Sequence, residues 1–464
     1  MSRKERDHLG ELELPDEVYY GIQTLRAVHN FPVSGLRSPP ELVQAYVLLK
    51  KASAMANMGL GVLDAERGAA IVEAADKVLQ GERMDDFVVD VFQAGAGTSF
   101  NMNVNEVLAN VALESMGRGK GDYGYLSPND HVNMAQSTND TYPTAAHMAV
   151  IDMSDMLAEV LERLGAALKA KAAELSTVRK SGRTHLMDAL PVTLGQEFGA
   201  YAAAVRRAGA RIAQRRDDLL EVPIGGTATG TGANSRLEYR GKVIGVLSAL
   251  TGRQFKAASD SFEALQSRSQ LVAYSSALKE LAIELVRIAN DLRLLGSGPT
   301  TGLAEIELPA VQPGSSIMPG KVNPVLAECL DMIGFQVIGN DTTVMLAGQA
   351  GQLELNVMAP IMAFNILGSQ RLLVNFLPVF TERCISGIAA DGPRCQEYLE
   401  HNPMLATLLV SRIGYLKAAE LADEARRTGR SVSRLAVQKG IITQEEAAQL
   451  FDSDAITSVR FSQP

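Results

Sequence analysis

The sequence has little cysteine, and its first residues are mostly charged where a leader would be apolar. Only Cys329, Cys384 and Cys395 occur among 464 residues, which is too few and too irregular for a disulfide framework or a paired-cysteine metal site. The first seven residues, M-S-R-K-E-R-D, are charged where a secretory signal peptide needs an apolar core. We therefore expect a cytoplasmic protein in a reducing compartment.

Long apolar runs and an excess of basic residues are also missing. Asp341 and Glu354 interrupt one of the most apolar parts of the chain, so no membrane span is expected. The net charge of -9 argues against nucleic acid or an anionic membrane as a partner. It does not exclude a small anionic substrate, but local cations would have to bind it.

Long helical periodicity dominates the rest of the chain. The composition, 46% hydrophobic and 21% charged, is that of a globular protein, and the length suggests about three domains. Apolar residues in 271–295 recur at alternating steps of three and four, and residues 150–168 show the same pattern. A second apolar set, Val272, Ile283 and Val286, widens the stripe. We therefore expect an all-α bundle whose helices are buried on more than one side. A coiled-coil scaffold is the alternative, although the polar loops are too elaborate for a simple rod.

The segment 313–324, P-G-S-S-I-M-P-G-K-V-N-P, concentrates hydroxyl, amine and amide groups ahead of an expected helix. Gly314 and Gly320 permit unusual backbone angles, and Pro324 suits the first helical position with Asn323 as its cap. Free N–H groups and the helix dipole attract anions at such an end. The segment therefore predicts an anion site.

Three further loops place small hydroxyl and amide residues ahead of expected helices. They are residues 94–106, residues 136–140, with a helix start expected at Pro143, and residues 182–188. Taken singly, each is most often only a helix cap. The glycine-rich segment 225–232 lacks both the Lys-Ser/Thr of a phosphate loop and the third glycine of a dinucleotide loop, so no nucleotide cofactor is expected.

The motif G-S-S-I-M-P-G-K-V-N-P resembles the signature loop of the aspartase/fumarase superfamily, and the likeness extends from residues 19–26 to residues 413–419. The resemblance implies a mostly helical, three-domain lyase fold with a long central bundle. We expect the domains at residues 1–137, 138–393 and 394–464. It also implies a homotetramer whose sites are each built from three chains, and a small dicarboxylate substrate. We expect no organic cofactor and assign no metal-binding residue.

Several short stretches bear on the choice between two activities within this superfamily. Residues 137–139, 337–344 and 351–356 resemble the aspartase versions, whereas residues 141–147 and 225–228 resemble those of fumarases. The balance favours an ammonia-lyase that reversibly converts aspartate into fumarate. A class II fumarase is the alternative, and a non-catalytic structural relative is a third possibility.

The resemblance also assigns roles to single residues. Removing a proton beside a carboxylate requires a base and groups that stabilise the resulting enediolate. Ser315 would be that base, acting as its alkoxide, and Glu328 would pair with His185 and orient its ring. The expected substrate-binding residues are Thr98, Ser137 and Thr138 at the carboxylate that becomes the enediolate, Lys321 and Asn323 at the other carboxylate, and Asn139 and Thr184 beside the amino group, together with His185.

Overall fold

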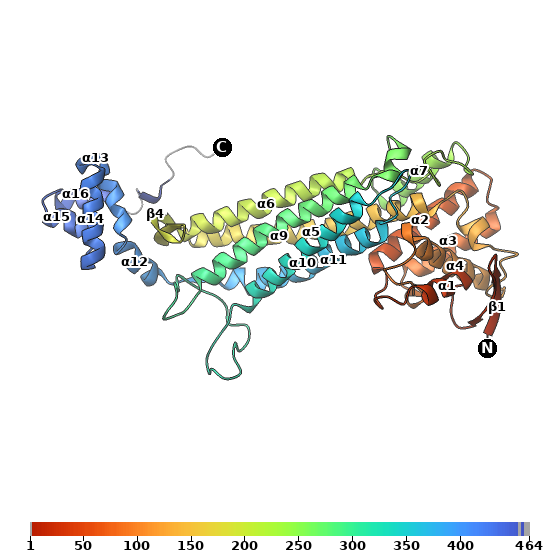
Figure 1. Ribbon diagram of the computed structural model, residues 1–464, viewed down its shortest axis with the longest axis horizontal. Helices are drawn as coiled ribbons and strands as arrows, with labels where there is room; N and C mark the ends of the chain where they lie inside the picture. Colours follow the sequence, from red (N-terminus) through yellow and green to blue (C-terminus); the bar gives the residue numbers. More distant parts are fainter. Residues whose placement is uncertain (1, 453–455, 459–464) are drawn as a thin grey trace. The chain divides into compact units, whose positions relative to one another are not determined.

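The computed structural model describes residues 2–452 and 456–458, and helices dominate it (Figure 1). Within these residues the strands form only four two-stranded sheets, so the expectation of a helical fold without a large sheet is confirmed. The helices are α1 (Ile22–Asn30), α2 (Pro40–Gly59), α3 (Ala65–Leu79), α4 (Thr98–Ser115), α5 (Thr138–Glu174), α6 (Leu194–Asp218), α7 (Tyr239–Thr251), α8 (Ser261–Gln266), α9 (Ser269–Leu295), α10 (Val325–Gln349), α11 (Ala359–Arg383), α12 (Gly392–Glu400), α13 (Val410–Ile413), α14 (Tyr415–Thr428), α15 (Val432–Gln438) and α16 (Gln444–Leu450).

The strands are short, and each pairs with the strand next to it in sequence order. Three pairs are antiparallel, and one pair, β5 with β6, is parallel. The antiparallel pairs are β1 (Ser2–Asp7) with β2 (Gly10–Pro15), β3 (Arg179–Thr184) with β4 (Met187–Thr193), and β7 (Ile306–Glu307) with β8 (Ala389–Ala390), and the parallel pair is β5 (Glu221–Val222) with β6 (Lys256–Ala257).

The chain divides into two compact units. The first comprises residues 1–159, 208–282 and 334–374, and the second comprises residues 160–207, 283–333 and 375–464. Each unit contains part of the long helices α5, α6, α9, α10 and α11. The expected division into three domains, at residues 137/138 and 393/394, is a different partition and stays a prediction.

A buried amide connects three of the long helices within the first unit. The side chain of Gln370 on α11 donates to the carbonyl oxygen of Val150 on α5 at 2.9 Å and to the hydroxyl of Tyr274 on α9 at 2.7 Å. Lys279 on α9 pairs with Asp341 on α10 at 2.5 Å. Buried polar groups need such partners, and here they fix the register of the helices.

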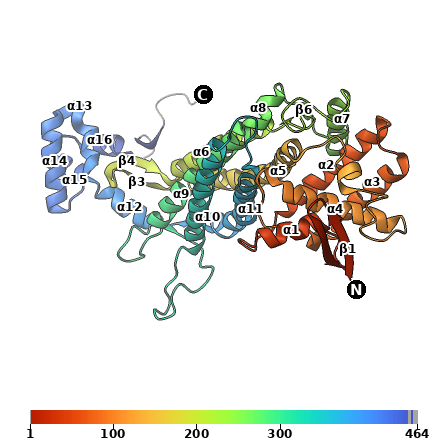
Figure 2. The same cartoon turned by 45° about the vertical axis from the view of Figure 1, so that its right-hand side comes forward.

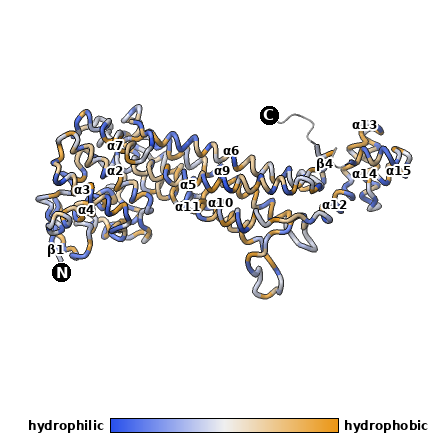
Figure 3. The backbone as a smooth tube through the Cα atoms, turned by 180° about the vertical axis from the view of Figure 1, so that it is seen from behind, coloured by the Kyte–Doolittle hydropathy of each residue, from blue (hydrophilic) through white to orange (hydrophobic). Residues whose placement is uncertain are grey.

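The apolar stripe predicted on α9 is buried, and Figure 3 shows hydrophobic residues recurring along this helix. The second apolar set behaves differently, because Ile283 is 51% exposed and Val272 and Val286 are half-buried in the single chain. Burial on further sides therefore stays a prediction for the assembled protein. The buried positions of the stripe are Leu271, Tyr274, Leu278, Leu281, Leu285, Ile288, Leu292 and Leu295.

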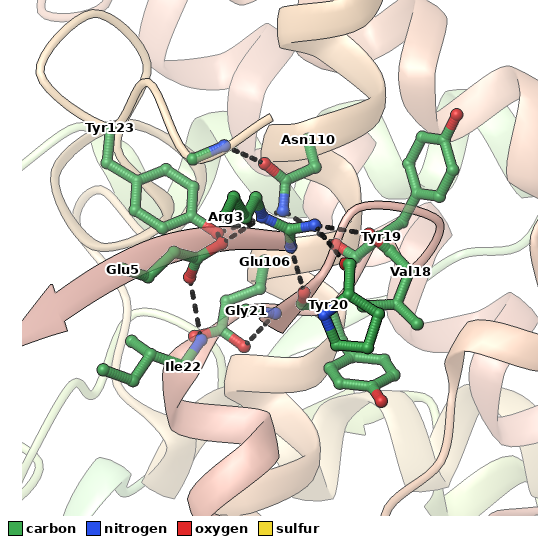
Figure 4. Close-up of polar contacts among 12 residues, drawn as sticks. Arg3, Glu5, Val18, Tyr19, Tyr20, Gly21, Ile22, Glu106, Asn110 and Tyr123 are labelled. Carbon is green, nitrogen blue, oxygen red and sulfur yellow. Dashed lines mark hydrogen bonds and ion pairs between the residues drawn. The ribbon is translucent and has the colours of Figure 1, made fainter. Parts of the chain in front are cut away.

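Carboxylates cap the start of α1 in the first unit (Figure 4). Glu106 on α4 accepts hydrogen bonds from the backbone N–H groups of Gly21 and Gln23, each at 2.9 Å. Glu5 on β1 accepts from the N–H of Ile22 at 2.8 Å. Negative charge at a helix N-terminus satisfies free N–H groups and complements the helix dipole. This cap joins α1 to α4.

A buried ion cluster holds the β3–β4 hairpin of the second unit, which Figure 2 shows beside α12. Glu305 is fully buried and accepts two hydrogen bonds from Arg183, at 2.9 and 2.8 Å. Lys180 pairs with Glu305 at 2.9 Å and with Glu197 at 2.8 Å. Two cations thus balance two carboxylates, as burial of charge requires.

The C-terminal helices of the second unit have an apolar core of their own, formed by buried residues from Leu399 to Ala447. Among the described residues, no helix combines the length and the apolar character that crossing a membrane would need.

Candidate active site

The residues expected at the active site divide between the two units. The first unit contains four of them, on or just before α4 and α5, and the second unit contains six, on the β3–β4 hairpin and around the loop before α10. Those of the first unit are Thr98, Ser137, Thr138 and Asn139, and those of the second are Thr184, His185, Ser315, Lys321, Asn323 and Glu328.

Thr98 is the first residue of α4, and its side chain is exposed. Gly97, directly before it, has a φ of +85°, and a Cβ at this position would lie 2.1 Å from the ring of Tyr142. Only glycine fits both the left-handed backbone and the close approach. The N–H of Ala96 also donates to the carbonyl oxygen of Val357 at 2.7 Å. The start of α4, and with it Thr98, is therefore fixed by tight local contacts.

Ser137 caps α5, which begins at Thr138 and not at Pro143 as expected. The N–H of Asn139 donates to the hydroxyl of Ser137 at 3.2 Å, and the N–H of Ser137 donates to the carboxylate of Asp140 at 3.1 Å. This reciprocal cap starts the helix early, and Pro143 is accommodated inside it at the loss of one backbone hydrogen bond.

Asp140 connects the start of α5 to the glycine-rich segment. Its other carboxylate oxygen accepts from the N–H groups of Gly225 at 3.0 Å and Thr227 at 2.8 Å. The side chain of Asn139 donates to the carbonyl oxygen of Ala228 at 2.7 Å. Burial raises the pKa of Asp140 to about 7, while the backbone hydrogen bonds act in the opposite direction. The glycine-rich segment thus binds a carboxylate of its own chain.

Polar residues that the sequence reasoning missed lie beneath Thr138. The side-chain amide of Asn101 donates to the hydroxyl of Thr138 at 3.0 Å and to Asn133 at 3.3 Å. Lys50, from the middle of α2, donates to the same oxygen of Asn133 at 2.9 Å. One signal was available, because Lys50 follows Val43, Tyr46 and Val47 by seven, four and three residues and so shares their face of the helix.

Thr184 and His185 lie on the exposed turn of the β3–β4 hairpin. The expectation that residues 182–188 lead into a helix is therefore wrong, since β4 intervenes and α6 begins only at Leu194. His185 and Leu186 have φ values of 56° and 60°, which is the conformation that two-residue hairpin turns require. The turn presents the imidazole of His185 to solvent in the single chain.

The Ser315 loop is closed by hydrogen bonds between its two arms. The N–H of Gly314 donates to the carbonyl oxygen of Lys321 at 2.8 Å, and a Cβ at Gly314 would lie 2.6 Å from the backbone nitrogen of Asn323. The hydroxyl of Ser315 accepts hydrogen bonds from the backbone N–H groups of Ile317 at 3.2 Å and Met318 at 3.0 Å. Ser315 is half-buried, so its oxygen sits in a small nest of N–H donors.

Asn323 does not cap α10 as expected. Its side chain donates to the carbonyl oxygen of Gly314 at 2.7 Å, and the helix begins at Val325, one residue after Pro324. An asparagine can accept at a helix start or donate across a loop, and here closure of the loop uses its donor. Lys321 is exposed at the same loop.

The predicted pairing of Glu328 with His185 is not formed within one chain. Glu328 is half-buried in the first turn of α10, and among residues 2–452 and 456–458 its carboxylate has no hydrogen bond or ion pair. The imidazole of His185 likewise has none within these residues. The pairing stays a prediction for the assembled protein.

The helical fold and the signature loop place the chain in a class of helical lyases, and comparison with known proteins agrees. The chain belongs to the lyase family, whose model matches residues 10–339. A second model, described as the fumarase C C-terminus, matches residues 405–458. The predicted membership of the aspartase/fumarase superfamily is thereby confirmed.

Similar proteins include two aspartate ammonia-lyases. That of Bacillus sp is 48% identical over 455 residues, 98% of this chain and 97% of that protein. That of Bacillus subtilis (strain 168) is 49% identical over 444 residues, 96% of this chain and 94% of that protein. A class II fumarate hydratase of Thermosynechococcus vestitus is 46% identical over 446 residues, 96% of each chain. The solved structure of a fumarate lyase:delta crystallin from Brucella melitensis bound to cobalt has a TM-score of 0.96 and 48% identity, covering 99% of this chain and 100% of that chain.

Proposed function

We propose that the chain is an aspartate ammonia-lyase, a carbon–nitrogen lyase that reversibly converts L-aspartate into fumarate and ammonia. The two Bacillus relatives carry this name, and residues 137–139, 337–344 and 351–356 resemble the aspartase versions. The observation that carries the chemistry is the pair of backbone N–H groups donating to the hydroxyl of Ser315.

Those two donors suit Ser315 to the role of base. The proton beside a carboxylate is very weakly acidic, so the base must be strong, and a serine hydroxyl in water is too weak an acid to supply an alkoxide. Hydrogen bonds donated to an oxygen favour its anionic form. The cationic side chain of Lys321 on the same loop would act in the same direction. Ser315 would then remove the proton, and the ammonia would leave from the neighbouring carbon.

The substrate carboxylates would be bound by groups of different character. Thr98, Ser137 and Thr138 are small donors at helix starts, where free N–H groups also favour negative charge, so they suit the carboxylate that becomes the enediolate. Lys321 and Asn323 would bind the other carboxylate. The amide of Asn323 uses one N–H on Gly314, which leaves its second N–H for the substrate.

The amino group would face Asn139, Thr184 and His185. His185 would assist departure of the amine, oriented by Glu328 of the assembled protein. By resemblance to the superfamily, we propose that the active site forms in a homotetramer, from loops of three chains. The lack of a contact between His185 and Glu328 within one chain is consistent with this arrangement. The proposed reaction needs no organic cofactor, and we place it in the cytoplasm.

Hydration of fumarate is the second candidate, favoured by residues 141–147 and 225–228 and by the similarity to a class II fumarate hydratase. Following the absorbance of fumarate with L-aspartate and L-malate in parallel separates the two. We expect faster turnover of aspartate. Faster turnover of malate would assign the chain to the fumarases, and no turnover of either would indicate a non-catalytic relative.

A further inference from the structure

A lysine side chain is buried without a carboxylate partner in the middle of α2. Lys50 is 0% exposed and donates hydrogen bonds to the side-chain oxygens of Asn133 at 2.9 Å and Gln136 at 3.0 Å. Across residues 2–452 and 456–458, no carboxylate lies within ion-pair distance of its amine. Burial of an ammonium ion beside neutral amides costs free energy of folding, so a role in function would explain why Lys50 is buried here.

The charged and titratable groups facing Lys50 are few. On α2 the ring of Tyr46 lies 5.6 Å from the amine. On α5 the carboxylate of Asp140 acts on Lys50 through space, but its oxygens are already bound by backbone N–H groups of Ser137, Gly225 and Thr227. The segment 132–136 faces Lys50 with amides alone. Burial lowers the pKa of Lys50 to about 7, against the opposing effect of Asp140.

Two amides connect Lys50 to a residue proposed to bind the substrate. The oxygen of Asn133 that accepts from Lys50 also accepts from Asn101 at 3.3 Å, and Asn101 donates to the hydroxyl of Thr138 at 3.0 Å. Thr138 is 7% exposed, so its hydroxyl is held by this network. The other partner of Lys50, Gln136, directly precedes Ser137.

We propose that Lys50 is a positioning residue for the substrate carboxylate that becomes the enediolate. It holds Thr138 through Asn133 and Asn101 and, in its protonated form, supplies positive charge beneath the loop that binds this group. The proposal rests on the proposed function, because it concerns the same dicarboxylate site. A cation in a low-dielectric interior acts on an anion more strongly than one in water, and it stabilises the enediolate dianion more than the starting carboxylate.

The test replaces Lys50→Met in the full-length assembled protein, with Lys51→Met as the matched control. Lys51 is the next residue of α2 and pairs with Asp76 on α3. We expect Lys50→Met to lower kcat/KM for aspartate at least about tenfold, with most of the loss in kcat. Lys51→Met should stay within about twofold of the wild type. Similar kinetics in the two variants would overturn the proposal.

A double substitution tests the route through Asn101. Residues that act through one network give non-additive losses. Combining Lys50→Met with Thr138→Val should therefore lower kcat/KM by clearly less than the product of the two single effects. A loss equal to that product would refute action through Thr138.

Asn133→Asp tests the role of Lys50 even if the Lys50→Met variant does not fold. The new carboxylate lies beside the amine of Lys50, so it neutralises the positive charge of the amine while still accepting its hydrogen bond. We expect kcat/KM to fall at least about tenfold, mostly through kcat, and the affinity for succinate, measured by calorimetry, to fall by a smaller factor. Unchanged values in a folded variant would overturn the proposal. Wild-type turnover of aspartate tests the proposed function separately, and succinate affinity tests Lys50 without any turnover.

Discussion

Replacing Glu305 by glutamine tests whether the buried ion cluster of the second unit fixes the turn of the β3–β4 hairpin. Glu305 pairs with Lys180 at 2.9 Å and with Arg183 through two bonds of 2.9 and 2.8 Å. Glutamine keeps the shape of the side chain but leaves two cations with Glu197 as their remaining carboxylate. Removing one partner of a buried ion pair costs about 3–5 kcal/mol. For local opening of the hairpin, 3 kcal/mol corresponds to roughly 100-fold faster amide exchange.

Hydrogen exchange over residues 179–193, followed by mass spectrometry, measures this opening directly. Glu280→Gln is the matched control, because Glu280 pairs with Arg211 where both side chains are about half exposed. An exposed pair contributes about 0–1 kcal/mol. We expect Glu305→Gln to speed exchange in the hairpin and to lower aspartate turnover, since Arg183 directly precedes the turn. Equal exchange in the two variants would refute the reasoning, and lost turnover with an unchanged hairpin would place the role of Glu305 elsewhere.

Three further predictions concern the base, the assembly and the pH dependence of stability. Ser315→Ala should lower kcat by about 10²- to 10⁴-fold, because it removes the proposed base. The melting temperature should not change, since Ser315 is half-buried on a loop. Substantial retained activity would exclude Ser315 as the base. Refolding Ser315→Ala together with Asn139→Ala should restore part of the activity, and mixed tetramers seen by native mass spectrometry without recovery would place both residues in one chain's site. Burial lowers the pKa of His147 from 6.5 to about 4. Between these pH values the unfolded chain binds a proton at His147 and the folded chain does not. About 3 kcal/mol of the free energy of unfolding, present above pH 6.5, is therefore lost as the pH falls toward 4. His147→Gln should flatten this dependence of the melting temperature, and an equally steep curve would assign it to other groups.

The long helices could be predicted from the sequence because their signal is local and repeated. The stripe in residues 271–295 matches α9 to within two residues at its start. Each apolar position contributes to burial in the same direction, so an error at one position changes little. The lateral faces of the same helix were less predictable. Ile283 is exposed in the single chain, so its burial would require the proposed assembly.

The loops were less predictable because their polar groups can be satisfied in more than one way. Asn323 could accept a hydrogen bond at a helix start, and the same side chain instead donates to Gly314, nine residues earlier. Nothing in the local sequence distinguishes the two arrangements, since the choice depends on how the chain folds back. Residues 182–188 were misassigned for a related reason: the left-handed conformation of His185 and Leu186 is imposed by strand pairing.

The proposed site residues of the two units are held in different ways, and this difference bears on which substitutions should change kcat and which should change KM. Thr138 is almost fully buried, and its hydroxyl already has the donor Asn101, which Lys50 holds through Asn133. A group fixed in this way needs little rearrangement when charge develops beside it, which is the condition for strong electrostatic stabilisation. Ser315, by contrast, lies on a loop that is closed by hydrogen bonds between its own arms and is exposed along much of its length. Ordering that loop on a ligand costs conformational entropy, so we expect substitutions around Thr138 to act mainly on kcat, and substitutions that stiffen or loosen the Ser315 loop to change KM and kcat together.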